Sequence, residues 1–125
     1  MPAYRAAPWG GPAAPLVDLA VSWNGKTEPM LAILDTGADQ TQISLAIAHA
    51  LGLRKIRDKK VTGTHGDTKC EPVYAANLAF DGLIFDSFPV VATSLPLALI
   101  GRDILNRVAV LDGPRQTFSL TTSPI

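Results

Sequence analysis

The chain has 125 residues, a length that suits a single domain with one hydrophobic core. Hydrophobic residues make up 47% of the sequence and charged residues 18%, which is the composition of a globular protein and excludes a disordered one. Eleven basic and eleven acidic residues cancel, and this balance removes the electrostatic argument for binding nucleic acid.

The cysteine content and the apolar runs narrow the class of protein further. A single cysteine, Cys70, leaves no disulfide within the chain and favours a reducing compartment, so we expect a cytoplasmic protein. No apolar run reaches the roughly 18 residues of a membrane helix, and no membrane segment is predicted.

The N-terminal segment differs in composition from the rest of the chain. Residues 1–15 are rich in Ala, Pro and Gly, and we interpret them as a flexible arm ahead of a domain at 16–125. The arm lacks the charged and then apolar pattern of a secretory signal. That the chain is cut from a longer protein stays open.

The first predicted elements form a hairpin. Residues 16–23 alternate between apolar and smaller or polar side chains, which predicts a half-buried strand. Asn24-Gly25 is a strong signal for a tight turn. Residues 29–34 are continuously apolar and predict a second strand, buried on both faces, that ends at Asp35.

The middle of the chain predicts one helix and a long hairpin. Ser44 is placed to cap a helix over 45–51, with Gly52 at its C-terminal cap. The basic segment 54–60 is interpreted as a solvated loop, apart from its last two residues, which begin a strand over 59–62. A further strand is predicted over 69–80, and the intervening tip should be mobile.

The last third predicts more short elements. They are an Asp81-Gly82 turn, a strand pair over 83–91 with Pro89 near an edge, a short buried strand at 97–100, a helix at 103–107, and a final hairpin of 108–111 with 116–120. Many short strands with two short helices indicate an all-β, barrel-like domain.

Two segments carry the chemical signal. Asp35-Thr36-Gly37 follows an apolar strand, which holds the Asp backbone in place; a lone Asp at a strand end would otherwise be a turn residue or helix cap. The segment 100–105 reads Ile-Gly-Arg-Asp-Ile-Leu. This pair of segments resembles the retropepsin-like, or retroviral-type, aspartic proteases, and the long helix before the hairpin is closer to their cellular and bacterial members.

The resemblance implies a closed all-β barrel with one or two short helices and an aspartic endopeptidase that acts on a peptide or protein. A second Asp-Thr-Gly or Asp-Ser-Gly is absent from the sequence, so two chains of a homodimer would each supply one Asp35. The two carboxylates would share one proton and activate a water molecule. No cofactor and no metal are implied.

The resemblance also implies roles for particular residues. Each triplet would provide the catalytic residues Asp35, Thr36 and Gly37. Substrate would contact the active-site loop and the tip of the hairpin that closes over it, at Gly37, Ala38, Asp39, Gly63, Thr64 and His65. Arg102, with Asp103 beside it, would brace the loop by pairing with Asp39 in a buried, bidentate ion pair. Apolar subsites are expected from Ile33, Val61, Leu95 and Leu97.

Other interpretations were weighed against this one. His49, His65 and Cys70 lack the spacing of zinc ligands, and Cys70 is better explained by its strand position than as a nucleophile. Trp9 and Trp23 are expected in the core or an interface. The main alternative function is a catalytically weak or inactive dimerisation or peptide-binding module. A further hypothesis is that the arm covers or tunes the dimer interface.

Overall fold

The computed structural model describes residues 3–62, 66–112 and 114–120. The elements in chain order are β1 (Leu16–Trp23), β2 (Lys26–Leu34), β3 (Gln42–Ser44), α1 (Leu45–Leu51), β4 (Arg54–Thr62), β5 (Thr68–Phe80), β6 (Leu83–Thr93), β7 (Ala98–Ile100), α2 (Arg102–Val108), β8 (Ala109–Asp112) and β9 (Thr117–Leu120). Neither helix is long enough or apolar enough to cross a membrane, within the described residues.

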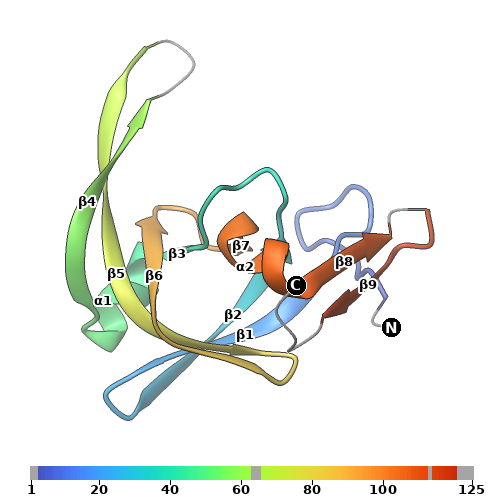
Figure 1. Ribbon diagram of the computed structural model, residues 1–125, viewed down its shortest axis with the longest axis horizontal. Coiled ribbons are helices and arrows are strands. Elements are labelled where there is room, and N and C mark those ends of the chain that lie inside the picture. Colours follow the sequence, from blue (N-terminus) through green and yellow to red (C-terminus); the bar gives the residue numbers. More distant parts are fainter. Residues whose placement is uncertain (1–2, 63–65, 113, 121–125) are drawn as a thin grey trace.

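Six strands close into a barrel, as the sequence predicts. The strand order is β1-β2-β7-β3-β6-β5, and β1 pairs again with β5 to close the ring. The β4 strand adds to β5 outside this ring. Together β4 and the outer part of β5 form a long curved hairpin that rises from the barrel on the same side as the loop between β2 and β3 (Figure 1).

The β1–β2 hairpin forms as predicted. The alternating side of β1 turns Val17, Leu19 and Val21 into the core, all less than 5% exposed. Asn24 and Gly25 have φ angles of 55° and 82°, the left-handed backbone that a two-residue hairpin turn requires.

The expectation that the strand before Asp35 is buried on both faces is wrong. In β2, Met30, Ala32 and Leu34 are buried, whereas Leu31 and Ile33 are only half-buried. The apolar run is continuous because both faces of the strand carry apolar side chains, each for a different reason. One face packs in the core, and the other is the face on which Asp35 also lies.

The neighbouring strand β7 has the same character and corrects the expectation of a buried strand at 97–100. Ala98 and Ile100 are fully buried, and Leu97 and Leu99 are half-buried. Because β2 and β7 run parallel, with Ile33 opposite Leu99, their half-buried side chains form a shared apolar face.

The first helix has the predicted ends. The Ser44 hydroxyl accepts a hydrogen bond from the Ala46 N–H at 3.2 Å, which satisfies one of the free donors of the first turn. Gly52 ends the helix with a φ of 63°. Ala48 and Leu51 face the core, as expected for this side of the helix.

The interpretation of the basic segment 54–60 as a loop is wrong, because it forms most of β4. Pairing with β5 from Arg54↔Ala75 to Thr62↔Thr68 supplies the stability that its own residues lack. In the described chain β4 is an edge strand that pairs with β5 alone, and its charged side chains disfavour pairing of the exposed edge with a strand of another molecule. A hydrogen bond and the negative charge of Asp58 raise the pKa of Lys55.

The predicted strand pair over 83–91 is instead one strand, β6. It follows the Asp81-Gly82 turn, whose φ angles of 50° and 78° match the expectation. A register shift beside Asn77 bends the hairpin, and Asn77 accepts a hydrogen bond from the Ser87 N–H at 2.9 Å. The strand continues through this bulge and pairs with β5 on one side and with β3 on the other.

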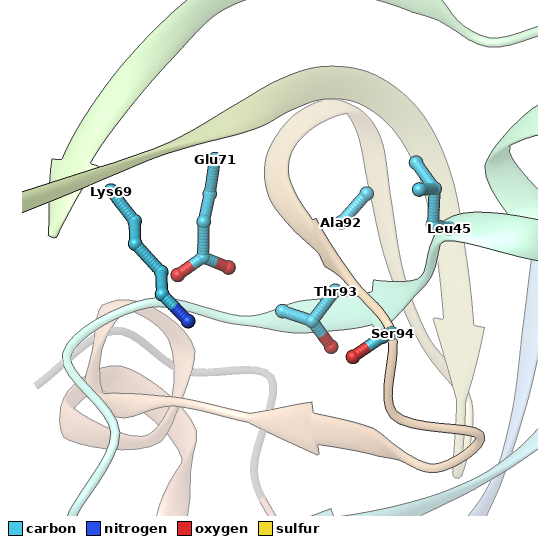
Figure 2. A pocket seen from close by; sticks show the side chains of 6 residues that line it. All are labelled: Leu45, Lys69, Glu71, Ala92, Thr93 and Ser94. Atoms are coloured by element: carbon cyan, nitrogen blue, oxygen red, sulfur yellow. The ribbon is translucent and has the colours of Figure 1, made fainter.

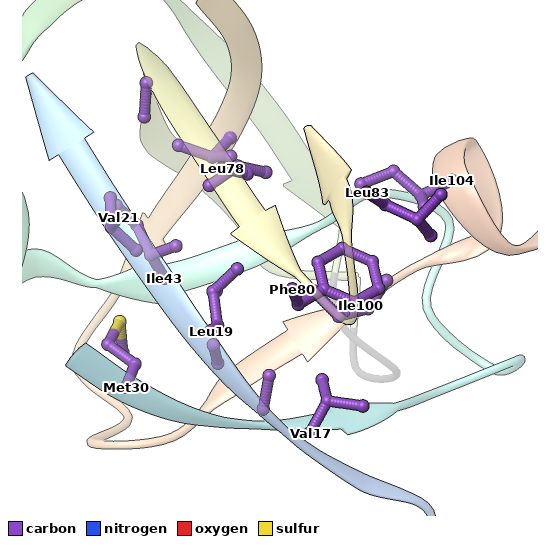
Figure 3. Close-up of a cluster of buried hydrophobic side chains, with 14 of the residues drawn as sticks. Val17, Leu19, Val21, Met30, Ile43, Leu78, Phe80, Leu83, Ile100 and Ile104 are labelled. Atoms are coloured by element: carbon purple, nitrogen blue, oxygen red, sulfur yellow. The ribbon is translucent and has the colours of Figure 1, made fainter. Parts of the chain in front are cut away.

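The core fills the barrel and continues under α2. The best-buried large side chains come from β1, β3, β5, β6, β7, α2 and β9, and Figure 3 shows several of them meeting. They are Leu19, Val21, Ile43, Val73, Leu78, Val90, Ile100, Ile104 and Phe118. Phe118 of β9 is 1% exposed, so the last described strand also contributes to this core.

The N-terminal segment packs beside the final β8–β9 hairpin. The Tyr4 N–H donates to the Gln116 carbonyl at 2.6 Å, and Ala3 pairs with Thr117. The Tyr4 ring lies 6.3 Å from that of Phe118, centre to centre. Trp9 is not in the core, since 56% of it is exposed. The mobility expected of the arm stays a prediction.

Candidate active site

Asp35 directly follows β2, at the end of its pairing with the parallel strand β7. Its backbone N–H donates to the Ile100 carbonyl of β7 at 2.9 Å, directly after the last residue of β2. The following turn is closed by the Ala38 N–H, which donates to the Asp35 carbonyl at 3.2 Å. The backbone that carries the carboxylate is therefore fixed on both sides.

The carboxylate is oriented by the glycine of its own triplet. The Gly37 N–H donates to Asp35 Oδ1 at 2.8 Å. Oδ2 makes no hydrogen bond within the described chain. A Cβ at Gly37 would lie 3.1 Å from Oδ1, so a side chain there would crowd the carboxylate. Asp35 is half-buried, while Thr36 and Gly37 are exposed at the tip of the loop.

A buried threonine ties this loop to α2. Thr41 is 0% exposed; its hydroxyl donates to Asp103 Oδ1 at 2.8 Å, and its N–H donates to Asp103 Oδ2 at 3.0 Å. The same hydroxyl accepts from the Gly101 N–H at 3.2 Å. Asp103 was expected to have a structural role near the loop; Thr41 was not singled out by sequence, although a hydroxyl six residues after the Asp was visible there.

Gly101 allows the two segments to come close. A Cβ at this position would lie 2.6 Å and 2.7 Å from the carbonyl carbon and oxygen of Gln40, and 3.0 Å from the Ala38 oxygen. Next to it, the Arg102 N–H donates to the Ala38 carbonyl at 2.8 Å. The start of α2 is thus packed on the active-site loop through backbone atoms.

Arg102 and Asp39 are brought together, in a setting that differs from the expected one. Arg102 Nη2 donates to Asp39 Oδ1, and this is the single hydrogen bond between the two side chains. The pair is exposed, with 50% of the Arg102 side chain and 70% of the Asp39 side chain accessible. The pairing is as expected, but a buried, bidentate pair is not formed in this chain.

The hairpin tip predicted to contact substrate, Gly63, Thr64 and His65, lies outside the described residues. The part of the hairpin next to this tip is described, and a pocket of about 280 Å³ lies between it and the end of β6. Lys69 and Glu71 extend into it from β5, facing Thr93 and Ser94 at the end of β6 (Figure 2). Leu45 and Ala92 complete the lining, so the pocket has both charged and apolar walls.

The described residues contain no cluster of three or more His, Cys, Asp or Glu side chains that could hold a metal ion. The active-site loop itself offers the Asp35 carboxylate, backbone N–H groups and the Thr36 hydroxyl. A half-buried carboxylate that stays in contact with solvent can act as a general acid or base toward water.

Comparison with solved structures places this architecture among known proteases. The chain is similar to the EIAV protease in complex with an inhibitor (22% identity, TM-score 0.58, covering 74% of this chain and 86% of that one). It is similar to a retropepsin-like aspartic protease from Rickettsia conorii (16%, 0.55, 93% and 86%) and to the retroviral protease-like domain of Ddi1 from Leishmania major (14%, 0.53, 87% and 90%). These likenesses show the retropepsin fold.

At the level of sequence, no curated protein matches this chain. The sequence pattern of the family described as Aspartyl protease matches residues 19–117, from the middle of β1 to the start of β9, and includes the whole site described above. The chain belongs to the aspartyl protease family.

Proposed function

We propose that this chain is an active aspartic endopeptidase that works as a homodimer, with one Asp35 from each chain in a shared active site. The observation that carries the proposal is the oriented Asp35 carboxylate: the Gly37 N–H donates to Oδ1, Oδ2 makes no hydrogen bond within the described residues, and the side chain is half-buried. Asp103, in the first turn of α2, differs from Asp35 in this respect, because it accepts hydrogen bonds from Thr41 through both of its oxygens.

The reaction requires two such carboxylates. Two carboxylates about 3 Å apart retain one proton between them. The ionised one removes a proton from a water molecule, which attacks the peptide carbonyl, while the protonated one donates to the carbonyl oxygen. As the tetrahedral intermediate collapses, the C–N bond breaks and the amine nitrogen takes a proton from the pair. The products are a carboxylic acid and an amine.

A second chain is the natural source of the second carboxylate. The sequence has one Asp-Thr-Gly, and a two-fold axis through the tips of two loops would bring the Asp35 residues together. Thr36 and Gly37 are exposed in the single chain, which supports their burial against a partner. We assign Thr36 to contacts across that axis and Gly37 to the close approach of both the carboxylate and the substrate backbone.

The remaining predicted residues support the loop and the substrate. Asp39 is exposed beyond the catalytic triplet, where an extended peptide would run, whereas Ala38 is buried and could meet the substrate through its backbone alone. In this proposal Gly63, Thr64 and His65 cover the peptide from the other side. We propose that Arg102 restrains Asp39 and that Asp103 anchors the loop through Thr41, so both act as positioning residues.

The decisive experiment compares wild type with Asp35→Asn on a mixed peptide library from about pH 3 to pH 7, the range in which a carboxyl pair changes protonation. Product termini are read by mass spectrometry. Asp81→Asn is the matched control, because Asp81 lies in an exposed turn and Asn also tolerates its positive φ. We expect wild type and Asp81→Asn to cleave alike and Asp35→Asn to be inactive.

Mixing experiments test the shared site directly. If wild type and Asp35→Asn subunits exchange freely in an equal mixture, about a quarter of the dimers contain two Asp35 residues, and activity per wild-type chain should fall by about half. Equal cleavage by wild type and Asp35→Asn would remove Asp35 from the mechanism. Dimers that bind peptides but never cleave them would favour a binding module over an enzyme.

A further inference from the structure

The N-terminal segment forms a loop that is closed by hydrogen bonds and presents a tryptophan. Arg5 and Ala14 exchange two backbone hydrogen bonds, of 2.8 Å and 2.9 Å, and Arg5 pairs with Asp18 of β1 at 3.3 Å. These contacts close a loop over residues 5–14 at its base, with Ala14 buried. At the far end the Gly10 N–H donates to the Ala7 carbonyl at 3.0 Å in the turn that carries Trp9.

Trp9 completes an apolar pocket on the barrel. The pocket has a volume of about 360 Å³ and is lined by Pro8, Trp9, Leu31, Pro96 and Leu97. Each lining side chain is apolar, and the indole N–H is the single polar group among them. A charged side chain that entered this pocket would lose its hydration without gaining a partner, so the pocket selects for apolar groups.

The pocket lies on the same side of the sheet as the catalytic carboxylate. Side chains alternate along β2, so Leu31 is on the face shared by Ile33 and Asp35. The parallel register with β7 extends this face to Leu97, one step before Ala98, which pairs with Ala32. Leu31 lies four positions before Asp35, a distance of about 13 Å along the strand, which an extended peptide covers in about four residues.

We propose that Trp9 is a specificity-determining residue, and that the pocket it closes takes a large apolar side chain, aliphatic or aromatic, three to four residues from the cleaved bond. The proposal rests on the proposed function, because the occupant is a side chain of the peptide substrate. Burial of Trp9 by that side chain would cover much of an aromatic surface that the free chain leaves 56% exposed. A two-fold dimer presents the pocket twice, so the preference should occur on both sides of the bond.

Cleavage profiles of wild type and Trp9→Ala test the proposal. The peptides compared differ only at the fourth position from the cleaved bond, which holds Leu or Phe in one set and Asp in the other. Wild type should cleave the Leu and Phe peptides with a kcat/KM about 10-fold or more above that for the Asp peptides. Trp9→Ala should lose most of this preference and keep its preferences next to the bond. Ile84→Ala is the matched control, since Ile84 is 73% exposed and lies outside this pocket.

A binding measurement separates this proposal from the question of catalysis. In the Asp35→Asn variant, a peptide with Leu at that position should shift the tryptophan emission to shorter wavelength, and the Asp peptide should not. Repeating the titration with Asp35→Asn/Trp9→Ala leaves Trp23 as the common background and should abolish the shift.

Three results would overturn the proposal: an unchanged profile in Trp9→Ala, equal shifts with both peptides, or a loss of dimer in Trp9→Ala by sedimentation, which would make the pocket a subunit contact. If wild type cleaves nothing while the Leu-dependent shift is present, the pocket assignment stands and the catalytic one fails.

Discussion

Replacement of Thr41 by valine should destabilise the protein by removing one hydroxyl from the contact between the active-site loop and α2. Valine keeps the shape of the side chain and its burial. The change leaves the Gly101 N–H and Asp103 Oδ1 without the partner they have at 3.2 Å and 2.8 Å. It also leaves the backbone hydrogen bond from the Thr41 N–H to Asp103 in place.

The expected magnitude follows from the burial of these groups. An unsatisfied buried donor or acceptor costs about 1 to 3 kcal/mol. Gly101 is buried and bears the full cost, whereas Asp103 is half-buried, so water can reach its carboxylate and its share is at the low end. We therefore expect Thr41→Val to lower the free energy of unfolding by about 2 to 4 kcal/mol.

Thr117 provides a matched control. Its hydroxyl oxygen is buried and has no hydrogen-bond partner within the described residues, so Thr117→Val removes no bond. That substitution should be neutral or stabilising by up to about 1 kcal/mol. Urea denaturation of both variants in the Asp35→Asn background avoids self-cleavage, and a single protein concentration keeps any contribution from dimerisation constant.

Comparing the free energies of unfolding of Thr41→Val and Thr117→Val can support or refute the role of the Thr41 hydroxyl. A cost for Thr41→Val below about 0.5 kcal/mol, or one equal to that of Thr117→Val, would refute the role assigned to this hydroxyl. A double-mutant cycle adds a direct test: Asp103→Asn should cost less in the Thr41→Val background than in wild type, with a coupling of about 1 kcal/mol or more.

Two further predictions concern the same contact. Gly101→Ala should lower the free energy of unfolding by about 3 kcal/mol or more in urea denaturation, because the added methyl group would lie 2.6 Å from a backbone atom of Gln40. A backbone atom cannot move aside as the end of a flexible side chain can. An unchanged free energy of unfolding would contradict this packing. Arg102→Lys should change stability by less than about 1 kcal/mol, since its ion pair with Asp39 is exposed. If Arg102 positions Asp39, kcat/KM for peptides should nevertheless fall measurably. An unchanged kcat/KM would show that this ion pair has no part in catalysis.

The elements that sequence predicts well are those with local causes. The β1–β2 hairpin follows from an alternating pattern and an Asn-Gly turn, and α1 follows from a capping serine and a C-terminal glycine. Each of these signals acts within a few residues, so it does not depend on what the rest of the chain does.

The elements that sequence predicts badly depend on partners far along the chain. The segment 54–60 is rich in lysine and arginine and has little strand propensity of its own, yet the register with β5 makes it a strand. The single strand over 83–93 contains a bulge, at which the Ser87 N–H donates to the side chain of Asn77, ten residues earlier in the chain. Neither interaction can be recognised from the residues that neighbour it in the sequence.

The candidate site shows the same division. The Asp35 triplet and the Gly-Arg-Asp turn could be found from their residues, whereas the hydrogen bonds of Thr41 could not, because they join positions about sixty residues apart. The exposure of the Arg102–Asp39 pair was likewise invisible, since burial depends on how the loop sits on the barrel.

The continuous apolar run before Asp35 deserves a different explanation from the one that sequence suggests. Such a run usually indicates a strand covered on both faces by its own chain. Here Ile33 and Leu99 are left half-buried on the side of the carboxylate, where an isolated chain gains nothing from apolar residues. Under the proposed function these side chains are covered when peptide is bound, so the residues that a strand pattern assigns to the core would be the ones that hold the substrate.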